Sequence, residues 1–186
     1  MNTYDFDKTI FYPDSSVTFV KYCARRYPGI VIGNIPKVIG TAAAHLLGRA
    51  DTKALKEKLF AFLAKLPDVD AVVDDFWKEN RQRIGQWYLE QKREDDLIIS
   101  ASPEFLLAPV CKSLGVNLIG TRMDKHSGKI DGRNCHDEEK VRRFYERYPE
   151  GHTEKFYSDS LSDTPMAMIA DEAYMLKKHI ISPWPK

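Results

Sequence analysis

The sequence has few cysteines and no surplus of charge of either sign. Its three cysteines, Cys23, Cys111 and Cys135, form no CxxC pair, which argues against a disulfide framework and a zinc knuckle. Twenty-eight Lys and Arg against twenty-seven Asp and Glu leave a formal net charge of +1, so no long-range field attracts nucleic acid. We therefore expect no nucleic-acid partner and a reducing, cytoplasmic location.

The sequence also lacks a long uninterrupted hydrophobic run. A membrane-crossing helix needs about 20 apolar residues, whereas the most apolar stretch, residues 30–47, is interrupted by Gly33, Pro36 and Lys37. The first residues do not have the basic, apolar and small-residue order of a signal peptide, so we expect no export signal and no transmembrane segment. Residues 30–47 are compatible with a peripheral contact with a bilayer, and a buried helix would explain them equally well.

The chain has two regions of different pattern. With 186 residues, 43% of them hydrophobic, it can form one catalytic domain with an inserted subdomain. Apolar residues recur at helical spacing through residues 15–91, with predicted helices at 15–27, 30–47, 53–66 and 69–91. After residue 95, short apolar runs at 97–99 and 116–119 and an extended segment at 155–157 alternate with predicted helices at 103–114, 136–148 and 164–171.

This alternation predicts an α/β fold. Together with a first strand at residues 2–6, it indicates a three-layer Rossmann-like core with a mostly parallel sheet covered on both faces. The helical region interrupts the sheet after its first strand. We therefore predict a catalytic core formed by residues 1–12 and 95–186, and an all-helical cap formed by residues 13–94.

Four short segments fall where strands of such a sheet should end. They are Asp-Phe-Asp-Lys-Thr at 5–9, Ser-Ala-Ser at 100–102, Lys140, and Asp-Ser-Leu-Ser-Asp at 159–163. The carboxyl ends of parallel strands share one edge, so these segments should converge. Carboxylates, a hydroxyl and an ammonium group together provide what phosphoryl transfer requires: a nucleophile, cation ligands, hydrogen-bond donors and a compensating positive charge.

These segments resemble the motifs of the haloacid dehalogenase superfamily. Residues 5–9 look like its DxDxT signature, and the other three segments match its remaining motifs in the same order. The helical insert is similar to the cap of the phosphoserine phosphatase-like branch, and residues 135–141 resemble that branch's lysine motif. Chain length and the region around residues 25–28 are also similar to the phosphatidylglycerophosphatase C group.

The resemblance implies a role for each matching residue. Asp5 would attack phosphorus, and Asp7 would protonate the leaving oxygen and later activate water. The ligands of Mg²⁺ would be the side chains of Asp5 and Asp159 and the main-chain carbonyl of Asp7. The remaining matches are phosphate-binding residues and supporting residues: Ser100, Ala101 and Lys140 in the first group, and Thr9, Asp163 and Asp14 in the second.

The sequence departs from the family pattern at two places. Lys8 stands where the family most often has glycine, and the fourth motif begins Ser158-Asp159 without the common Gly-Asp pair. Simpler roles also exist for some residues, since Ser100, Asp14 and Asp163 could serve only as caps of strands or helices. The five histidines, at positions 45, 126, 136, 152 and 179, share no ligand spacing and are interpreted as surface or packing residues.

The sequence therefore predicts a magnesium-dependent phosphomonoester hydrolase with an aspartyl-phosphate intermediate. Its substrate would be a small phosphorylated metabolite or a phospholipid head group. The alternative is a phosphate- or metal-binding module of the same fold without turnover. A receiver-type signalling domain shares the acid cluster and lysine, but the long insert after the first strand argues against it. The sequence does not indicate the oligomeric state.

Overall fold

A computed structural model describes residues 1–178 and 180–185, which form a sheet of six strands in the order β3-β2-β1-β4-β5-β6. Strands β1 to β5 run parallel and β6 is antiparallel to β5. The mostly parallel sheet confirms the predicted fold class. His179 lies outside the described residues. The strands are β1 (Thr3–Tyr4), β2 (Leu97–Pro103), β3 (Asn117–Thr121), β4 (Thr153–Ser158), β5 (Ala170–Lys177) and β6 (Ile180–Pro183).

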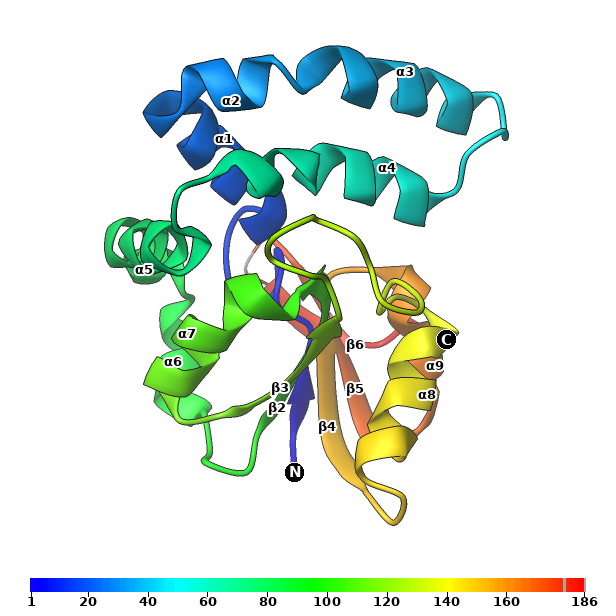
Figure 1. Cartoon of the computed structure of the whole chain (residues 1–186). Coiled ribbons are helices and arrows are strands. Elements are labelled where there is room, and N and C mark those ends of the chain that lie inside the picture. Colours follow the sequence, from blue (N-terminus) through cyan, green and yellow to red (C-terminus); the bar gives the residue numbers. More distant parts are fainter. Residues whose placement is uncertain (179, 186) are drawn as a thin grey trace.

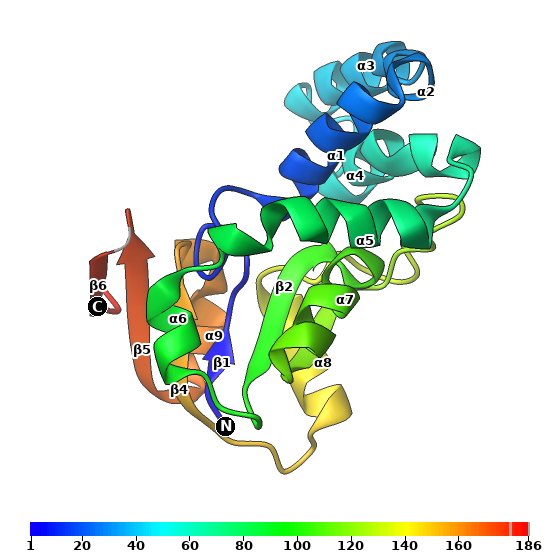
Figure 2. The same cartoon turned by 90° about the vertical axis from the view of Figure 1, so that its left-hand side faces the viewer.

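Helices cover both faces of this sheet (Figures 1 and 2). Helices α5, α6 and α7 lie on one face, and α8 and α9 lie on the other. The helices are α1 (Ser15–Arg26), α2 (Pro28–Ile32), α3 (Ile35–Leu46), α4 (Thr52–Phe60), α5 (Val69–Asn80), α6 (Gln86–Gln91), α7 (Glu104–Leu114), α8 (Glu138–Arg147) and α9 (Thr164–Met168), with 3₁₀ turns at Ala61–Lys65, Arg81–Arg83 and Leu161–Asp163.

The apolar run of β2 is buried on both of its faces, as expected for a central parallel strand. Leu97 and Ile99 belong to the hydrophobic cluster on the α8–α9 side, which also contains Phe144. Ile98 belongs to the hydrophobic cluster on the opposite face, which also contains Leu106 of α7. Alternate residues of one strand thus hold the two helical layers to the same sheet.

Helix ends follow the polar residues that the sequence supplies. Asp14, Asp51 and Asp68 each accept a hydrogen bond from the backbone N–H three residues later, at 2.8, 2.7 and 3.1 Å, and so cap α1, α4 and α5. Gly115 ends α7 with φ +71°, a left-handed conformation that favours glycine. These local signals explain the starts of α1, α4 and α5 and the end of α7. The predicted helices 30–47 and 69–91 are each divided in the structure, the first into α2 and α3 and the second into α5 and α6.

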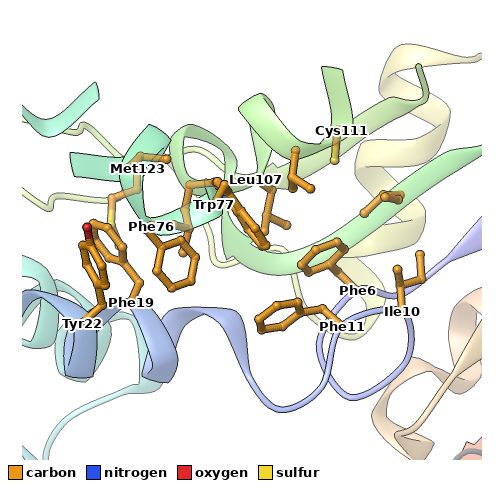
Figure 3. Packing of buried hydrophobic residues seen from close by; sticks show 14 of the residues in the cluster. Phe6, Ile10, Phe11, Phe19, Tyr22, Phe76, Trp77, Leu107, Cys111 and Met123 are labelled. Atoms are coloured by element: carbon orange, nitrogen blue, oxygen red, sulfur yellow. The ribbon is translucent and has the colours of Figure 1, made fainter. Parts of the chain in front are cut away.

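A row of aromatic rings joins the loop after β1 to the cap helices (Figure 3). Phe11 contacts Trp77 with ring centroids 5.3 Å apart, Trp77 contacts Phe76 at 4.9 Å, and Phe76 contacts Phe19 at 5.4 Å. The indole N–H of Trp77 donates to the carbonyl of Leu106 in α7 at 2.6 Å. Aromatic contacts of this kind add stabilisation beyond area burial, so the first loop is held firmly against α1 and α5.

The predicted cap range contains helices in two different positions. Helices α1 to α4 stand beyond the carboxyl ends of the strands, whereas α6 lies beside the sheet (Figure 2). Tyr88 of α6 packs edge-on against Tyr4 of β1, with ring centroids 4.9 Å apart. The boundary of the cap at residues 13–94 stays a proposal. Among the described residues, no helix is long and apolar enough to cross a membrane.

The C-terminal part differs from the sequence prediction. The predicted helix 164–171 is too long, because α9 ends at Met168 and Asp171 already belongs to β5. Strands β5 and β6 were not predicted. Most residues of β5 are exposed or half-buried, with Asp171 and Glu172 close to its start, and the residues of β6 are exposed at the sheet edge. Neither strand therefore shows a clear apolar pattern.

Two glycines provide a matched test of the contact between the loop after β3 and the cap. Gly128 and Gly132 both have positive φ, +72° and +76°, but only at Gly128 would a Cβ lie 2.6 Å from the carbonyl oxygen of Phe60. Gly132→Ala should cost about 1 kcal/mol of stability from the left-handed conformation alone. Gly128→Ala should cost about 1–3 kcal/mol more, because backbone must move. Chemical denaturation measures both, and equal losses would contradict this contact.

Candidate active site

The site begins in the loop that follows β1. The N–H of Asp5 donates to the carbonyl of Tyr157 in β4 at 2.8 Å, which continues the parallel pairing for one residue. The chain then turns tightly, because the N–H groups of Ile10 and Phe11 both donate to the carbonyl of Phe6 at 2.9 Å. Phe6, Ile10 and Phe11 are buried and anchor the turn. Asp5 and Asp7 are thereby held at the carboxyl end of β1, facing the cap.

Lys140 joins the first and fourth motifs. Its Nζ lies 2.7 Å from Oδ1 of Asp5 and 2.8 Å from Oδ2 of Asp163, and only 1% of the residue is exposed. Burial alone would lower the pKa of Lys140, but the carboxylates of Asp5 and Asp163 raise it above its ordinary value. Because both contacts are short and buried, Lys140 is held as an ammonium ion between two carboxylates.

Asp5 experiences opposing influences. Burial is the largest and raises the pKa of its carboxyl group, Lys140 lowers it, and the neighbouring Asp163 and Asp7 raise it further. The hydroxyl of Thr9 donates to Oδ2 of Asp5 over a long 3.4 Å. Thr9 therefore contacts Asp5 directly, at the position expected of a supporting residue. A second positive charge in the cavity would favour the ionised form of Asp5.

Asp7 is held by different partners from Asp5. Its Oδ1 accepts from the backbone N–H of Ser15 at 2.6 Å, and its Oδ2 accepts from the hydroxyl of Ser102 at 2.5 Å. Burial and the nearby Asp14 raise the pKa of Asp7, whereas these two hydrogen bonds lower it and leave the net shift upward. The two carboxyl groups of the first motif thus have separate environments, and only Asp5 contacts Lys140.

The second motif supplies a buried hydroxyl. Ser100 in β2 accepts from the N–H of Ser102 at 3.1 Å, and its own O–H remains available as a donor. The hydroxyl of Ser102 points to Asp7, and the residue at the cap position of α7 is Pro103. Ser102 is therefore not the helix cap that its position before α7 suggests.

Eight of the nine residues predicted for the site line one cavity of about 210 Å³. We name it the catalytic cavity. Thr9 is the exception, since it contacts Asp5 without lining the cavity. The residues predicted from the sequence that line the cavity are Asp5, Asp7, Asp14, Ser100, Ala101, Lys140, Asp159 and Asp163. The four motifs converge because the sheet is parallel. Their convergence does not by itself assign a role to any one residue.

Three acidic residues of the cavity differ in their hydrogen bonds and surroundings. Asp14 caps α1, as the simpler interpretation predicts, and it also lines the cavity, where its supporting role stays a prediction. Asp163 precedes α9, but its side chain makes no capping hydrogen bond there. Its Oδ2 instead accepts from Lys140 and from the hydroxyl of Ser158. Burial raises the pKa of Asp159, and the positive charge of Lys8 partly offsets this rise.

The oxygen atoms of the cavity fit a small divalent cation. Oδ1 of Asp163 is buried without a hydrogen-bond partner among the described residues, and no described residue donates to the main-chain carbonyl of Asp7. No three His, Cys, Asp or Glu side chains of the described residues gather tightly enough to enclose an ion. Mg²⁺ does not require such a cage, because it keeps several waters and shares substrate phosphate oxygens. The carboxylates of Asp5 and Asp159 with the Asp7 carbonyl are a suitable donor set.

Sequence reasoning missed two residues that border the site, Lys56 and His136. Lys56 of α4 reaches the core, where its Nζ contacts the carbonyl of Ala101 at 2.5 Å and Oδ1 of Asn134 at 3.0 Å. His136, interpreted as a surface residue, is exposed but lies at the rim of the catalytic cavity. Lys56 resembles any other lysine on a charged helix, so the sequence contains no local signal for its position.

Lys56 and His136 also line a second cavity of about 290 Å³ between the cap and the core, which we name the cap cleft. Its apolar wall consists of Val17, Leu55 and Leu59. Asp7 lines both cavities, so the cap cleft opens beside the carboxyl group expected to act on the leaving oxygen. Burial lowers the pKa of Lys56 to about 8, while Asp7 and Asp14 oppose that shift.

The family model of the haloacid dehalogenase-like hydrolases matches residues 3–168. The chain therefore belongs to this family, which confirms the resemblance seen in its motifs. Protein CicA of Caulobacter vibrioides is 31% identical over 182 residues, covering 91% of this chain and 82% of that protein.

Solved structures share the fold. A Bordetella pertussis protein described as having unknown function superposes with a TM-score of 0.75 at 21% identity, covering 93% of this chain and 87% of that one. A structure described as a phospho-aspartyl intermediate analogue of phosphoserine phosphatase has a TM-score of 0.55 at 14% identity, covering 92% and 83% respectively. At these identities, the comparisons establish the fold alone.

Lys8 adopts a left-handed backbone conformation, with φ +59°. An L-residue with a Cβ is strained there, whereas glycine is not. Lys8→Gly should therefore be more stable than Lys8→Ala by about 1 kcal/mol. Both variants remove the charge beside Asp159, so their difference isolates the backbone effect. Urea denaturation measures it, and an alanine variant as stable as the glycine variant would rule out the left-handed backbone.

Proposed function

We propose that this chain is a magnesium-dependent phosphomonoester hydrolase that acts through a phosphorylated Asp5. The observation that carries the proposal is the different environment of the two carboxyl groups in the first motif. Asp5 faces an ammonium group, and Asp7 is held by an amide and a hydroxyl. The ammonium of Lys140 favours the anionic form of Asp5 against the burial that raises its pKa, whereas Asp7 has no such cation in contact among the described residues and its raised pKa favours it as a proton carrier. This division matches a nucleophile paired with a general acid and base.

In the first half-reaction, a carboxylate oxygen of Asp5 forms a bond to phosphorus as the bond to the leaving oxygen breaks. Asp7 transfers its proton to that oxygen, so a neutral alcohol departs. Lys140 offsets the repulsion between Asp5 and the incoming dianion, and the Ser100 hydroxyl and the Ala101 amide donate to phosphoryl oxygens. Mg²⁺ bound by Asp5, Asp159 and the Asp7 carbonyl would supply further positive charge to those oxygens.

In the second half-reaction, Asp7 is a carboxylate and accepts a proton from water. The water oxygen bonds to phosphorus, the bond from phosphorus to Asp5 breaks, and inorganic phosphate leaves. Asp5 and Asp7 return to their initial protonation states, so the cycle is complete. Both steps require Asp7 close to the same phosphorus as Asp5, and both residues line the same cavity.

The cap cleft supports a proposal about the substrate. Val17, Leu55 and Leu59 offer an apolar wall beside Asp7, and Lys56 offers a positive charge. Two of the three ammonium donors of Lys56 are used by Ala101 and Asn134, which leaves one for a ligand. We infer a leaving group that contains an apolar part and an anion. A small metabolite and a phospholipid head group both satisfy this description. Cytoplasmic location stays a prediction.

Asp5→Asn tests the nucleophile. Its amide cannot form the phosphorylated intermediate, so turnover of p-nitrophenyl phosphate with Mg²⁺ should fall at least about a thousandfold. Asp74→Asn, which changes an exposed acid on α5, should leave turnover unchanged. Chelation of Mg²⁺ should inactivate the unmodified protein in the same assay.

Substantial Mg²⁺-dependent turnover by Asp5→Asn would refute the assignment of the nucleophile. An unmodified protein that binds phosphate but never turns over any phosphomonoester would instead identify the binding module that the sequence left as an alternative. Calorimetric titration with inorganic phosphate distinguishes these two outcomes.

Lys56→Met tests recognition of the leaving group. The protonated amine binds an anion, and its pKa is about 8, so kcat/KM for phosphoserine should fall as pH rises through 8. Lys56→Met should lower that kcat/KM about tenfold at pH 7 and abolish this pH dependence, with a smaller effect on p-nitrophenyl phosphate. Lys58→Met is the control, because Lys58 lies two residues further along α4, on a different side of the helix, and is exposed. Equal losses for both substrates would argue against this role.

A further inference from the structure

The outer side of α3 is an exposed apolar face. The helix buries no residue completely, and its inner side packs on α4 while its outer side faces away from the core (Figures 1 and 2). We name as the docking face the large apolar side chains exposed on α3 and its two ends: Ile32, Ile35, Ile39, Leu46 and Leu47. Exposure reaches 63% for Ile39 and 86% for Leu46. A helix surface in water normally carries charged groups at such positions.

The spacing of these residues keeps them together. Ile35, Ile39 and Leu46 are separated by four and seven residues, so they lie along one side of the helix. The helix packs on α4, and its N-terminal end is fixed there, since the side-chain amide of Asn34 donates to the main-chain carbonyl of Lys58 at 2.6 Å. The docking face is therefore presented outward by a helix that is held from behind.

The segment of the chain that carries the docking face has charges of one sign. Between Asp14 and Asp51 the chain has five Lys or Arg and no Asp or Glu, although the whole chain is almost neutral. Lys21, Lys37 and Arg49 form no ion pair with a described residue. Arg25 and Arg26 have only loose contacts with acids of α5, at 3.7 to 3.9 Å. The positive charge near the docking face is thus available to an external anion.

We propose that the docking face binds the surface of an anionic phospholipid bilayer. An apolar helix face bordered by cations matches the interfacial region of such a bilayer, where acyl chains lie directly below anionic head groups. A second copy of this chain is a poorer occupant, because a symmetric contact would place two acid-free, positively charged segments against each other. The helix lies in the plane of the surface and does not cross it. The catalytic cavity, on the other side of α4, remains open to substrate.

Vesicle flotation of the full chain tests this proposal. The unmodified protein should float with vesicles of phosphatidylcholine and phosphatidylglycerol, float much less with pure phosphatidylcholine, and detach at high salt. Ile39→Glu should weaken binding to the mixed vesicles at least about tenfold. Met168→Glu is the matched control, since Met168 is 80% exposed but lies on α9, away from the cap. It should float like the unmodified protein.

Two further measurements accompany the flotation. Ile39→Glu should keep the circular dichroism spectrum and the p-nitrophenyl phosphate turnover of the unmodified protein, because the substitution touches neither the core nor the catalytic cavity. Failure of the unmodified protein to float with anionic vesicles would overturn the proposal, as would equal losses in Ile39→Glu and Met168→Glu. A dimer that Ile39→Glu converts to a monomer in light scattering would show that a second copy covers the face.

Discussion

The contact of Lys140 with two buried carboxylates is the interaction on which the site depends. Taking a lysine out of water is costly, and removal of one partner from a buried ion pair typically costs 3–5 kcal/mol. Here the ammonium lies between Asp5 and Asp163, so each charge has an opposite neighbour within 2.8 Å. The same contact joins the end of β1, the start of α8 and the turn after β4. The ion pairs of Lys140 therefore favour the same positions of Asp5 and Asp163 that the ends of these elements give them.

The surroundings of Asp5 and Asp7 show how one short motif provides two functions. Successive side chains of an extended segment alternate in direction, so residues two apart start on the same side. The tight turn after Phe6 then leaves Asp5 against Lys140 and Asp7 against Ser15 and Ser102. Without this turn, the two carboxyl groups would share one environment and repel each other. Lys8, with its left-handed backbone, is part of the geometry that separates them.

The sequence predicted the sheet class and the convergence of the motifs because both depend on local signals. A buried apolar run identifies β2, a capping residue at Asp14 identifies the start of α1, and each motif stands directly at an element end. The edge strands β5 and β6 were missed because exposed strands have no strong apolar alternation. Lys56 was missed because only tertiary packing brings it to Ala101 and Asn134. The left-handed φ of Lys8 was also not predicted, since lysine rarely adopts it.

The central claim is that Asp5 becomes covalently phosphorylated during turnover. Rapid acid quenching of the enzyme with a phosphomonoester, followed by peptide mass spectrometry, measures this directly. The account predicts a phosphoryl group on the peptide that contains Asp5, present within one turnover and lost on further incubation as inorganic phosphate forms. Phosphate release with no labelled peptide at any time, or with the label on another residue, would contradict it.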